Sequence, residues 1–222
     1  MNVKPFIKYD IGGAYHWKWY ILNYEGYRNF SNTLTELVPG PGRVLDVGCG
    51  DGLISYLFFR LGCNVVGIDT SPTAIHLAKI VSQIAVQGAM GSEIKELQGM
   101  AFVQGEKELM LSRLKQGALQ YLESSIYDFN EPDSFDYAIC SEVIEHLEHP
   151  EQLLKNVHAS IRKFAIITTP NGLLPDGSIN LPGPYDYHVW SPETFTTLLE
   201  GYKFEFLDLK PETIAIKLYK TP

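Results

Sequence analysis

The sequence predicts an α/β fold in which a mostly parallel sheet has helices on both faces. Two observations support this prediction. Short apolar runs alternate with helical stretches along most of the chain, a pattern typical of parallel strands joined by helices. The chain has 222 residues, which suits one sizeable domain and would be a tight fit for two.

The first forty residues are rich in aromatic side chains, and we expect them to form a helical cap. Four rings recur at steps of three and four residues, which places them on one face of a helix. These rings belong to Trp17, Tyr20, Tyr24 and Tyr27. The face either docks on the core or forms the wall of an acceptor pocket, where His16 and Trp19 add polar-edged rings.

The next stretch predicts strand, turn, helix, strand and helix in succession. An apolar run at residues 43–47 stops at a glycine-rich segment, and a helix is expected at 53–61. A second buried strand ends at Asp69. Ser71 and Pro72 are a typical helix start, so a further helix is expected to about residue 86.

The remaining elements follow the same alternation. Residues 88–117 read as an insertion with helical pieces at 93–97 and 106–115, separated by glycines. Strands are expected at 118–123, 135–140 and 164–168, and helices at 149–161 and 192–200. Two alternating runs, 203–209 and 213–219, predict an antiparallel hairpin at the sheet edge. The domain division expected from this reading is a cap at 1–40 and a main domain at 41–222.

The charge balance indicates the kind of ligand, and the cysteines indicate the cellular compartment. Lys and Arg number 18 against 26 Asp and Glu, giving a net charge of -8. A nucleic-acid surface needs basic residues, so a neutral or cationic small ligand fits better. The three cysteines show no pairing pattern, which favours a reducing cytoplasm. We expect no signal peptide or membrane span, because no apolar run is long enough.

The glycine-rich turn after the first strand favours close approach of a ligand to the backbone. Gly48, Gly50 and Gly52 have no Cβ that would collide with a ligand. The third glycine of a dinucleotide motif is missing, and Asp46 would repel a pyrophosphate but suit a positively charged ligand. Asp69, 19 residues after Gly50, is placed to bind the two hydroxyls of a ribose.

Three segments in the same order resemble the class I S-adenosylmethionine-dependent methyltransferases. They are residues 44–52, 67–72 and 135–147. The resemblance covers about residues 40–220 and implies a Rossmann-like, seven-stranded sheet with an antiparallel last strand. It also implies S-adenosylmethionine as the cofactor. The contacts that it implies are Asp46, Gly48, Cys49, Gly50, Asp69, Thr70, Ser125, Ile126 and Cys140.

A cluster of titratable residues follows the strand at 135–140. Glu142, Glu145 and His146 have the spacing i, i+3 and i+4, so a helical turn would project them from one face. His188 could return to the same pocket. His146 or His188 could act as a general base, with Glu145 beside it, or all four residues could bind a divalent cation that lowers the pKa of a hydroxyl. Alternatively, the glutamates cap the helix and His146 packs.

Two families with a similar Glu-x-x-Glu-His segment bear on this choice. The small-RNA 2'-O-methyltransferases bind metal with it and have a later histidine four residues before a Trp. Here Asp186 stands at that position and His188 is two residues before Trp190, which disfavours the metal. The ubiquinone-pathway O-methyltransferases have a very similar segment and methylate a small phenol.

The sequence therefore predicts a methyltransferase that acts on a small molecule, through a hydroxyl group. His16, Trp19, Tyr20 and Glu142 are the candidates for contact with that acceptor. A metal-dependent RNA 2'-O-methyltransferase and a non-catalytic cofactor-binding module are the alternatives. The intact loop from Asp46 to Gly52 and the carboxylate of Asp69 count against the binding module.

Overall fold

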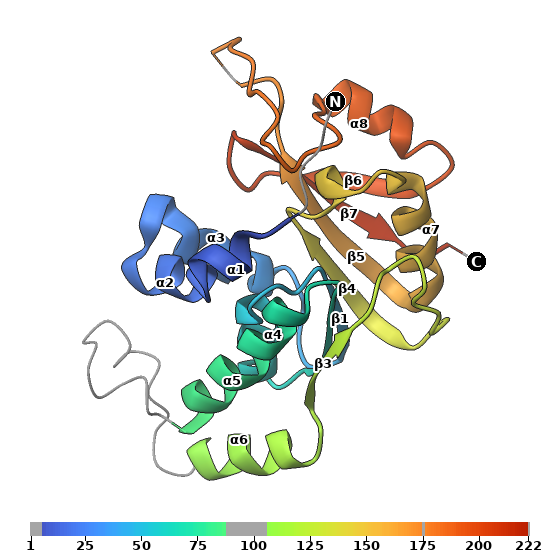
Figure 1. The fold of residues 1–222 in the computed structure, drawn as a ribbon. Coiled ribbons are helices and arrows are strands. Elements are labelled where there is room, and N and C mark those ends of the chain that lie inside the picture. The colour runs from blue at the N-terminus through green and yellow to red at the C-terminus, as the bar shows by residue number, and fades with distance from the viewer. Residues whose placement is uncertain (1–5, 88–105, 175, 222) are drawn as a thin grey trace. The chain divides into compact units, whose positions relative to one another are not determined.

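The computed structural model describes residues 6–87, 106–174 and 176–221 (Figure 1). Its strands are β1 (Arg43–Val47), β2 (Asn64–Asp69), β3 (Leu119–Glu123), β4 (Phe135–Ser141), β5 (Ile161–Pro170), β6 (Lys203–Leu207) and β7 (Thr213–Tyr219). They form a seven-stranded sheet in the order β3-β2-β1-β4-β5-β7-β6. β2 is parallel to β1 and β3, and β4 is parallel to β5, whereas β7 is antiparallel to both β5 and β6. The predicted fold class and terminal hairpin are confirmed.

The chain divides into two compact units, which we call the N-terminal unit (Lys8–Ser124) and the C-terminal unit (Met1–Ile7 with Ser125–Pro222). The expected boundary at residues 40 and 41 lies inside the N-terminal unit and stays a prediction. The helical piece expected at 93–97 lies outside the described residues.

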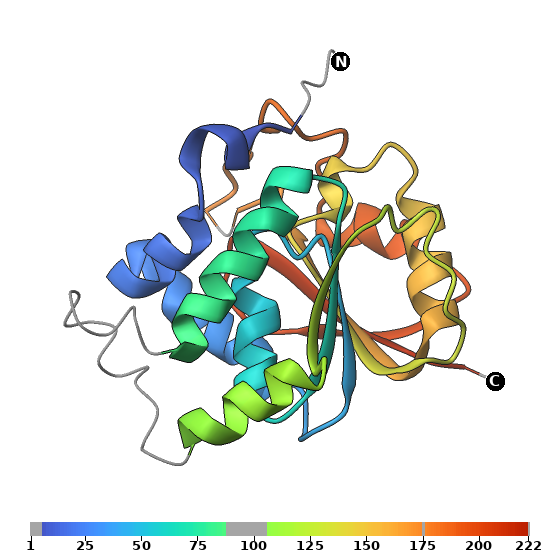
Figure 2. The ribbon, with the colours of Figure 1, turned by 60° about the horizontal axis from the view of Figure 1, so that its bottom comes forward.

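The N-terminal unit holds β1, β2 and β3. Its helices are α1 (Lys8–Gly12), α2 (Tyr15–Leu22), the short 3-10 helix η1 (Tyr24–Gly26), α3 (Tyr27–Glu36), α4 (Leu53–Arg60), α5 (Pro72–Gln87) and α6 (Glu106–Lys115). α4 and α5 pack on β2 and β3 and run beside each other (Figure 2). α4 is apolar around most of its circumference, and six of its eight residues are buried. It therefore forms much of the core of this unit.

The single aromatic helix expected near residues 17–27 is wrong, because the chain breaks between α2 and α3. Asn23, Glu25 and Gly26 have φ angles of 49°, 45° and 72°, in the left-handed region that ends a helix. Arg28 stabilises the break, since its Nε donates to the carbonyl oxygen of Tyr20 at 2.8 Å. As a result, Trp17 and Tyr20 are buried, while Tyr24 is 51% exposed.

The C-terminal unit holds β4, β5, β6 and β7. Its helices are the 3-10 helix η4 (Ile144–His146), α7 (Pro150–Ser160) and α8 (Pro192–Leu198). α7 packs on β5, burying Leu153, Leu154 and Val157. α8 begins with a capping box in which the side chain of Ser191 accepts a hydrogen bond from the backbone N–H of Thr194, and Pro follows at its first turn.

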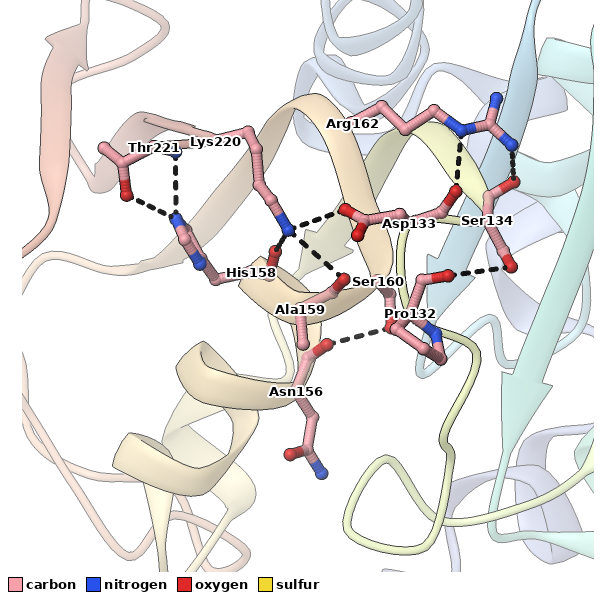
Figure 3. Close-up of polar contacts among 10 residues, drawn as sticks. All are labelled: Pro132, Asp133, Ser134, Asn156, His158, Ala159, Ser160, Arg162, Lys220 and Thr221. Carbon is pink, nitrogen blue, oxygen red and sulfur yellow. Dashed lines mark hydrogen bonds and ion pairs between the residues drawn. The ribbon is translucent and has the colours of Figure 1, made fainter.

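A polar network connects the last residues of α7 with the start of β5 and with the residue that follows β7 (Figure 3). Lys220 Nζ donates to the carbonyl oxygens of His158 and Ala159 and pairs with the carboxylate of Asp133 at 2.8 Å. Arg162 Nε donates to the carbonyl oxygen of Asp133 at 2.6 Å. A lysine on the last carbonyls of a helix offsets their partial negative charge, so this network stabilises the end of α7.

Within the part of the chain that the structure describes, no helix combines the length and the apolar character needed to cross a membrane.

Candidate functional site

The glycine-rich turn connects β1 to α4 in the N-terminal unit. Gly48, Gly50 and Gly52 have φ angles of 67°, 54° and 82°, which side chains with a Cβ rarely adopt. A Cβ on Gly52 would lie 2.6 Å from the hydroxyl of Tyr121. The backbone N–H of Cys49 donates to the carbonyl of Ile68 at 2.9 Å, which ties the turn to β2. Glycine is therefore required here for both conformation and space.

Asp69 lies at the end of β2 and binds this turn directly. Its Oδ2 accepts from the backbone N–H of Gly50 at 2.9 Å, and its Oδ1 accepts from that of Ser71 at 2.8 Å. Each oxygen retains a further lone pair for a ligand hydroxyl. Burial raises the pKa of Asp69, and the hydrogen bonds from Ser71 and Gly50 oppose that shift. Thr70, beside it, is exposed.

Asp46 and Cys49 point into the protein. Asp46 Oδ2 accepts from the hydroxyl of Ser55 at 2.6 Å, and burial raises the pKa of Asp46 to about 7. Burial also raises the pKa of the Cys49 thiol. Asp46 is therefore only partly charged near neutral pH, which weakens the electrostatic argument that the sequence suggested for it.

The N-terminal aromatic segment lies on this turn through contacts that the sequence did not indicate. A Cβ on Gly50 would lie 1.9 Å from the hydroxyl of Tyr9, so Tyr9 occupies the space beside that glycine. Asp51 is fully buried; its Oδ2 accepts from the backbone N–H of His16 at 2.9 Å, and its carbonyl accepts from Trp17 Nε1 at 2.8 Å. Asp51 is part of the glycine-rich motif. The motif itself gives no sign that Asp51 binds His16, which lies 35 residues earlier in the chain.

The three aromatic residues expected to contact an acceptor separate into two groups. His16 stacks on Tyr27 with ring centroids 5.5 Å apart, and its Nδ1 lies 3.3 Å from Asp51 Oδ1. Trp19 lies edge-on to the ring of His16, with centroids 5.7 Å apart. Tyr20 is buried, and its hydroxyl donates to Asn32 Oδ1 at 2.9 Å. Tyr20 therefore has a structural partner of its own, and the other two share one ring cluster.

In the C-terminal unit, the glutamates after β4 bind two consecutive threonines of β5. Thr168 Oγ1 donates to Glu142 Oε1 at 2.9 Å, and Thr169 Oγ1 donates to Glu145 Oε2 at 3.2 Å. Consecutive side chains of a strand point to opposite faces. Glu142 has a φ of 56° and precedes η4, so the expected single helical turn carrying all three residues does not form.

Glu145 is buried, and its pKa is raised by this burial and by the negative charge of Glu142. Its backbone carbonyl also accepts hydrogen bonds from the N–H groups of Tyr187 and His188, at 2.8 and 3.3 Å. Glu145 thereby ties η4 to the segment before α8. Its catalytic role stays a prediction.

His146 is held at one nitrogen by two acceptors. Its Nδ1 lies 2.9 Å from Asp186 Oδ1 and 3.2 Å from the carbonyl oxygen of Tyr185. The ring of Phe6 lies beside it, with centroids 5.1 Å apart. The other ring nitrogen, Nε2, lies 3.9 Å from Glu145 Oε1. The spacing of the sequence motif did not predict Asp186 as the partner of this ring.

His188 stacks on Trp190, with ring centroids 5.0 Å apart and planes inclined by 18°. Its Nε2 is buried and has no hydrogen-bond partner among the described residues. An unpaired buried nitrogen costs on the order of 1–3 kcal/mol. The catalytic role of His188 stays a prediction.

The other expected cofactor contacts are in the C-terminal unit. Ser125 Oγ accepts from the backbone N–H of Tyr127 at 3.1 Å, which shapes the turn after β3. Ile126 is buried, and its carbonyl accepts from Asn156 Nδ2 at 2.7 Å. Cys140 is fully buried on β4. Their contacts with a cofactor stay predictions.

In residues 6–87, 106–174 and 176–221, no group of three or more His, Cys, Asp or Glu side chains is arranged to hold a metal ion. The four candidates have other contacts. Glu142 and Glu145 bind threonines, His146 binds Asp186, and His188 stacks on Trp190.

Similar proteins were found by sequence and by structure. A ubiquinone biosynthesis O-methyltransferase of Schizosaccharomyces pombe is 30% identical over 60% of this chain and 36% of its own length. One of Xanthomonas campestris is 29% identical over 80% of this chain and 60% of its own length. This chain thus spans between about a third and three fifths of these curated relatives.

Two solved structures share the fold at low identity. A magnesium protoporphyrin IX methyltransferase from Synechocystis has a TM-score of 0.64 at 14% identity, covering 96% of this chain and 97% of its own. A SAM-dependent methyltransferase from Aquifex aeolicus has a TM-score of 0.58 at 15% identity, covering 87% and 90%. The family model described as a methyltransferase domain matches residues 22–209. Since this match includes most of the chain, the protein belongs to the methyltransferase domain family.

Proposed function

We propose that this protein transfers a methyl group from S-adenosylmethionine to a hydroxyl group of a small molecule, with His146 accepting the proton. Family membership supports the transfer. The relatives named as ubiquinone biosynthesis O-methyltransferases support oxygen as the acceptor atom. The net charge of -8 supports a small molecule over a nucleic acid. The three cysteines are buried and form no disulfide among the described residues, which fits a reducing compartment such as the cytoplasm.

The hydrogen bond between Gly50 and Asp69 carries the proposal for the cofactor. This bond holds the half-buried carboxylate of Asp69, at the end of β2, beside the backbone of Gly50, where no Cβ blocks a ligand. This arrangement fits a nucleoside ligand: Asp69 would accept hydrogen bonds from the ribose hydroxyls, and the backbone of Gly48 and Gly50 would lie against the methionine portion.

When bound, S-adenosylmethionine supplies a methyl carbon that bonds to the acceptor oxygen while its bond to sulfur breaks, the electron pair staying on sulfur. The acceptor oxygen loses a proton in this reaction. His146 Nε2 takes that proton, because Nδ1 is already engaged by Asp186 and Tyr185. Little further assistance is needed, because holding two reactants in line supplies much of the rate.

Two measurements test the proposal. Isothermal titration with S-adenosylhomocysteine should show one site per chain. Label from methyl-labelled S-adenosylmethionine should enter a catechol such as 3,4-dihydroxybenzoate. His146→Gln should lower kcat roughly 10²- to 10⁴-fold, the usual contribution of a general base, with unchanged binding of S-adenosylhomocysteine.

His149→Gln is the matched control, because the side chain of His149 is 64% exposed. It should leave both measurements unchanged. Failure of the folded wild-type protein to bind S-adenosylhomocysteine would contradict the proposed function. Full activity in His146→Gln would contradict the role given to this histidine.

A further inference from the structure

We propose that Asp186 is a positioning residue that fixes the ring of His146 and stabilises its positive charge once it has taken a proton. This inference rests on the proposed function, which makes His146 the base. It adds a residue from another segment of the chain, 40 positions later.

The two acceptors at Nδ1 determine which nitrogen of His146 carries the proton. Asp186 Oδ1 and the carbonyl oxygen of Tyr185 can only accept, at 2.9 and 3.2 Å. Nδ1 must therefore carry the hydrogen in the neutral ring, which leaves Nε2 unprotonated. Only this tautomer can accept a proton from a hydroxyl at Nε2.

Asp186 is itself fixed by a tight turn. Its Oδ2 accepts from the backbone N–H of Gly183 at 2.5 Å, and its own N–H donates to the carbonyl of Gly183 at 3.2 Å. A Cβ on Gly183 would lie 3.0 Å from Asp186 Oδ2, so glycine allows this approach. The next residue, Tyr187, donates its N–H to the carbonyl of Glu145, immediately before His146. Hydrogen bonds thus fix the carboxylate of Asp186 on one side and the backbone next to His146 on the other.

The surroundings make this contact stronger than a surface ion pair. The side chains of His146 and Asp186 are only 21% and 15% exposed. Phe6 packs against both His146 and Tyr185, with ring centroids 5.1 Å apart in each case. Limited access of water strengthens a charge-assisted hydrogen bond. The negative carboxylate then stabilises the imidazolium that forms when the acceptor proton reaches Nε2.

Asp186→Asn tests the inference without an acceptor. The amide keeps the shape, removes the charge and can turn its NH₂ group toward Nδ1, which favours the wrong tautomer. In ¹⁵N-labelled protein at about pH 8.5, well above the ordinary pKa of histidine, long-range ¹H–¹⁵N spectra should show the Nδ1–H tautomer of His146 with a downfield proton. In Asp186→Asn that proton should move upfield, and the Nε2–H tautomer should increase.

His158 is an internal reference in the same spectra. Its Nε2 accepts from the backbone N–H of Thr221 at 3.2 Å, so its tautomer should not change. Asp176→Asn is the matched control variant, because Asp176 is exposed and its carboxylate accepts from the N–H and the hydroxyl of the nearby Ser178. An unchanged tautomer and proton resonance of His146 in Asp186→Asn would overturn the inference.

Kinetics separate this inference from the proposed function. With 3,4-dihydroxybenzoate, Asp186→Asn should lower kcat by roughly 10- to 10⁴-fold, no more than the full contribution of the base, while KM for S-adenosylmethionine stays the same. No methyl transfer by the wild-type protein would count against the proposed function alone. Normal kcat in Asp186→Asn, with His146→Gln impaired, would overturn the role of Asp186 alone.

Discussion

At the scale of single residues, the buried carboxyl of Asp46 makes stability depend on pH. Its ordinary pKa of 3.8 is raised to about 7 in the folded protein, chiefly by burial. The folded state therefore binds this proton more readily than the unfolded state between about pH 4 and 7. The contribution of Asp46 to stability is greatest at low pH and falls as pH rises through this window, by at most roughly 4 kcal/mol.

Asp46→Asn should remove this dependence, because the amide stays neutral and can still accept from Ser55. The free energy of unfolding, measured with urea near pH 5 and near pH 8, should fall more in the wild type than in the variant, by roughly 2–3 kcal/mol. Asp208→Asn, at an exposed position, should follow the wild type. Equal pH dependence in Asp46→Asn and the wild type would contradict the assignment.

Sequence spacing indicated one contact of the candidate site and missed others. Gly50 and Asp69 were expected together because the ends of neighbouring parallel strands meet at one edge, and they share a hydrogen bond. Asp186 and Tyr9 were not predicted as partners of His146 and Gly50. Those contacts depend on loop geometry between distant segments, which no periodicity in the sequence encodes.

At the scale of elements, the break between α2 and α3 shows how backbone conformation overrides an aromatic pattern. The spacing of Trp17, Tyr20, Tyr24 and Tyr27 favours one helix, but the left-handed backbone at Asn23, Glu25 and Gly26 is not compatible with it. Most strands and later helices were predicted closely, because many are bounded by glycine, proline or a capping residue. β5 is the exception, since it begins at Ile161, directly after α7, and was expected only from residue 164. The aromatic stretch also contains residues that commonly end helices, Asn23 and Gly26, but the spacing of its rings pointed to one continuous helix.

Gly26→Ala distinguishes the two arrangements. No atom of the described residues lies within 4 Å of a Cβ at this position, so the cost comes from its φ of 72°. In the broken arrangement the variant should lose roughly 1 kcal/mol, or about 2–4 °C in Tm. A continuous helix would instead gain stability from alanine. Gly12→Ala is the control and should change Tm little, because the φ of Gly12 is not in the left-handed region. A higher Tm for Gly26→Ala than for the wild type would contradict the break between α2 and α3.

At the scale of the whole molecule, cofactor binding should stabilise the folded chain. A ligand that binds only the native state, present at about 100 times its Kd, adds roughly 2.7 kcal/mol. S-adenosylhomocysteine should therefore raise Tm by roughly 5–10 °C, measured by calorimetry. Asp69→Asn should reduce that rise, because it weakens the proposed contact with ribose, whereas Asp208→Asn should keep it. An equal rise in Asp69→Asn would argue against the role of this carboxylate.

The position of β7 has a consequence for how the protein is made. β7 lies between β5 and β6, although it follows both in the chain. During synthesis, β6 leaves the ribosome before the strand that joins it to the sheet exists. Until β7 emerges, the edge of β5 has unpaired backbone groups, a template for association with other chains. Completion of this sheet must therefore wait for residues 213–219, and a nascent chain stalled before them is the form most exposed to aggregation.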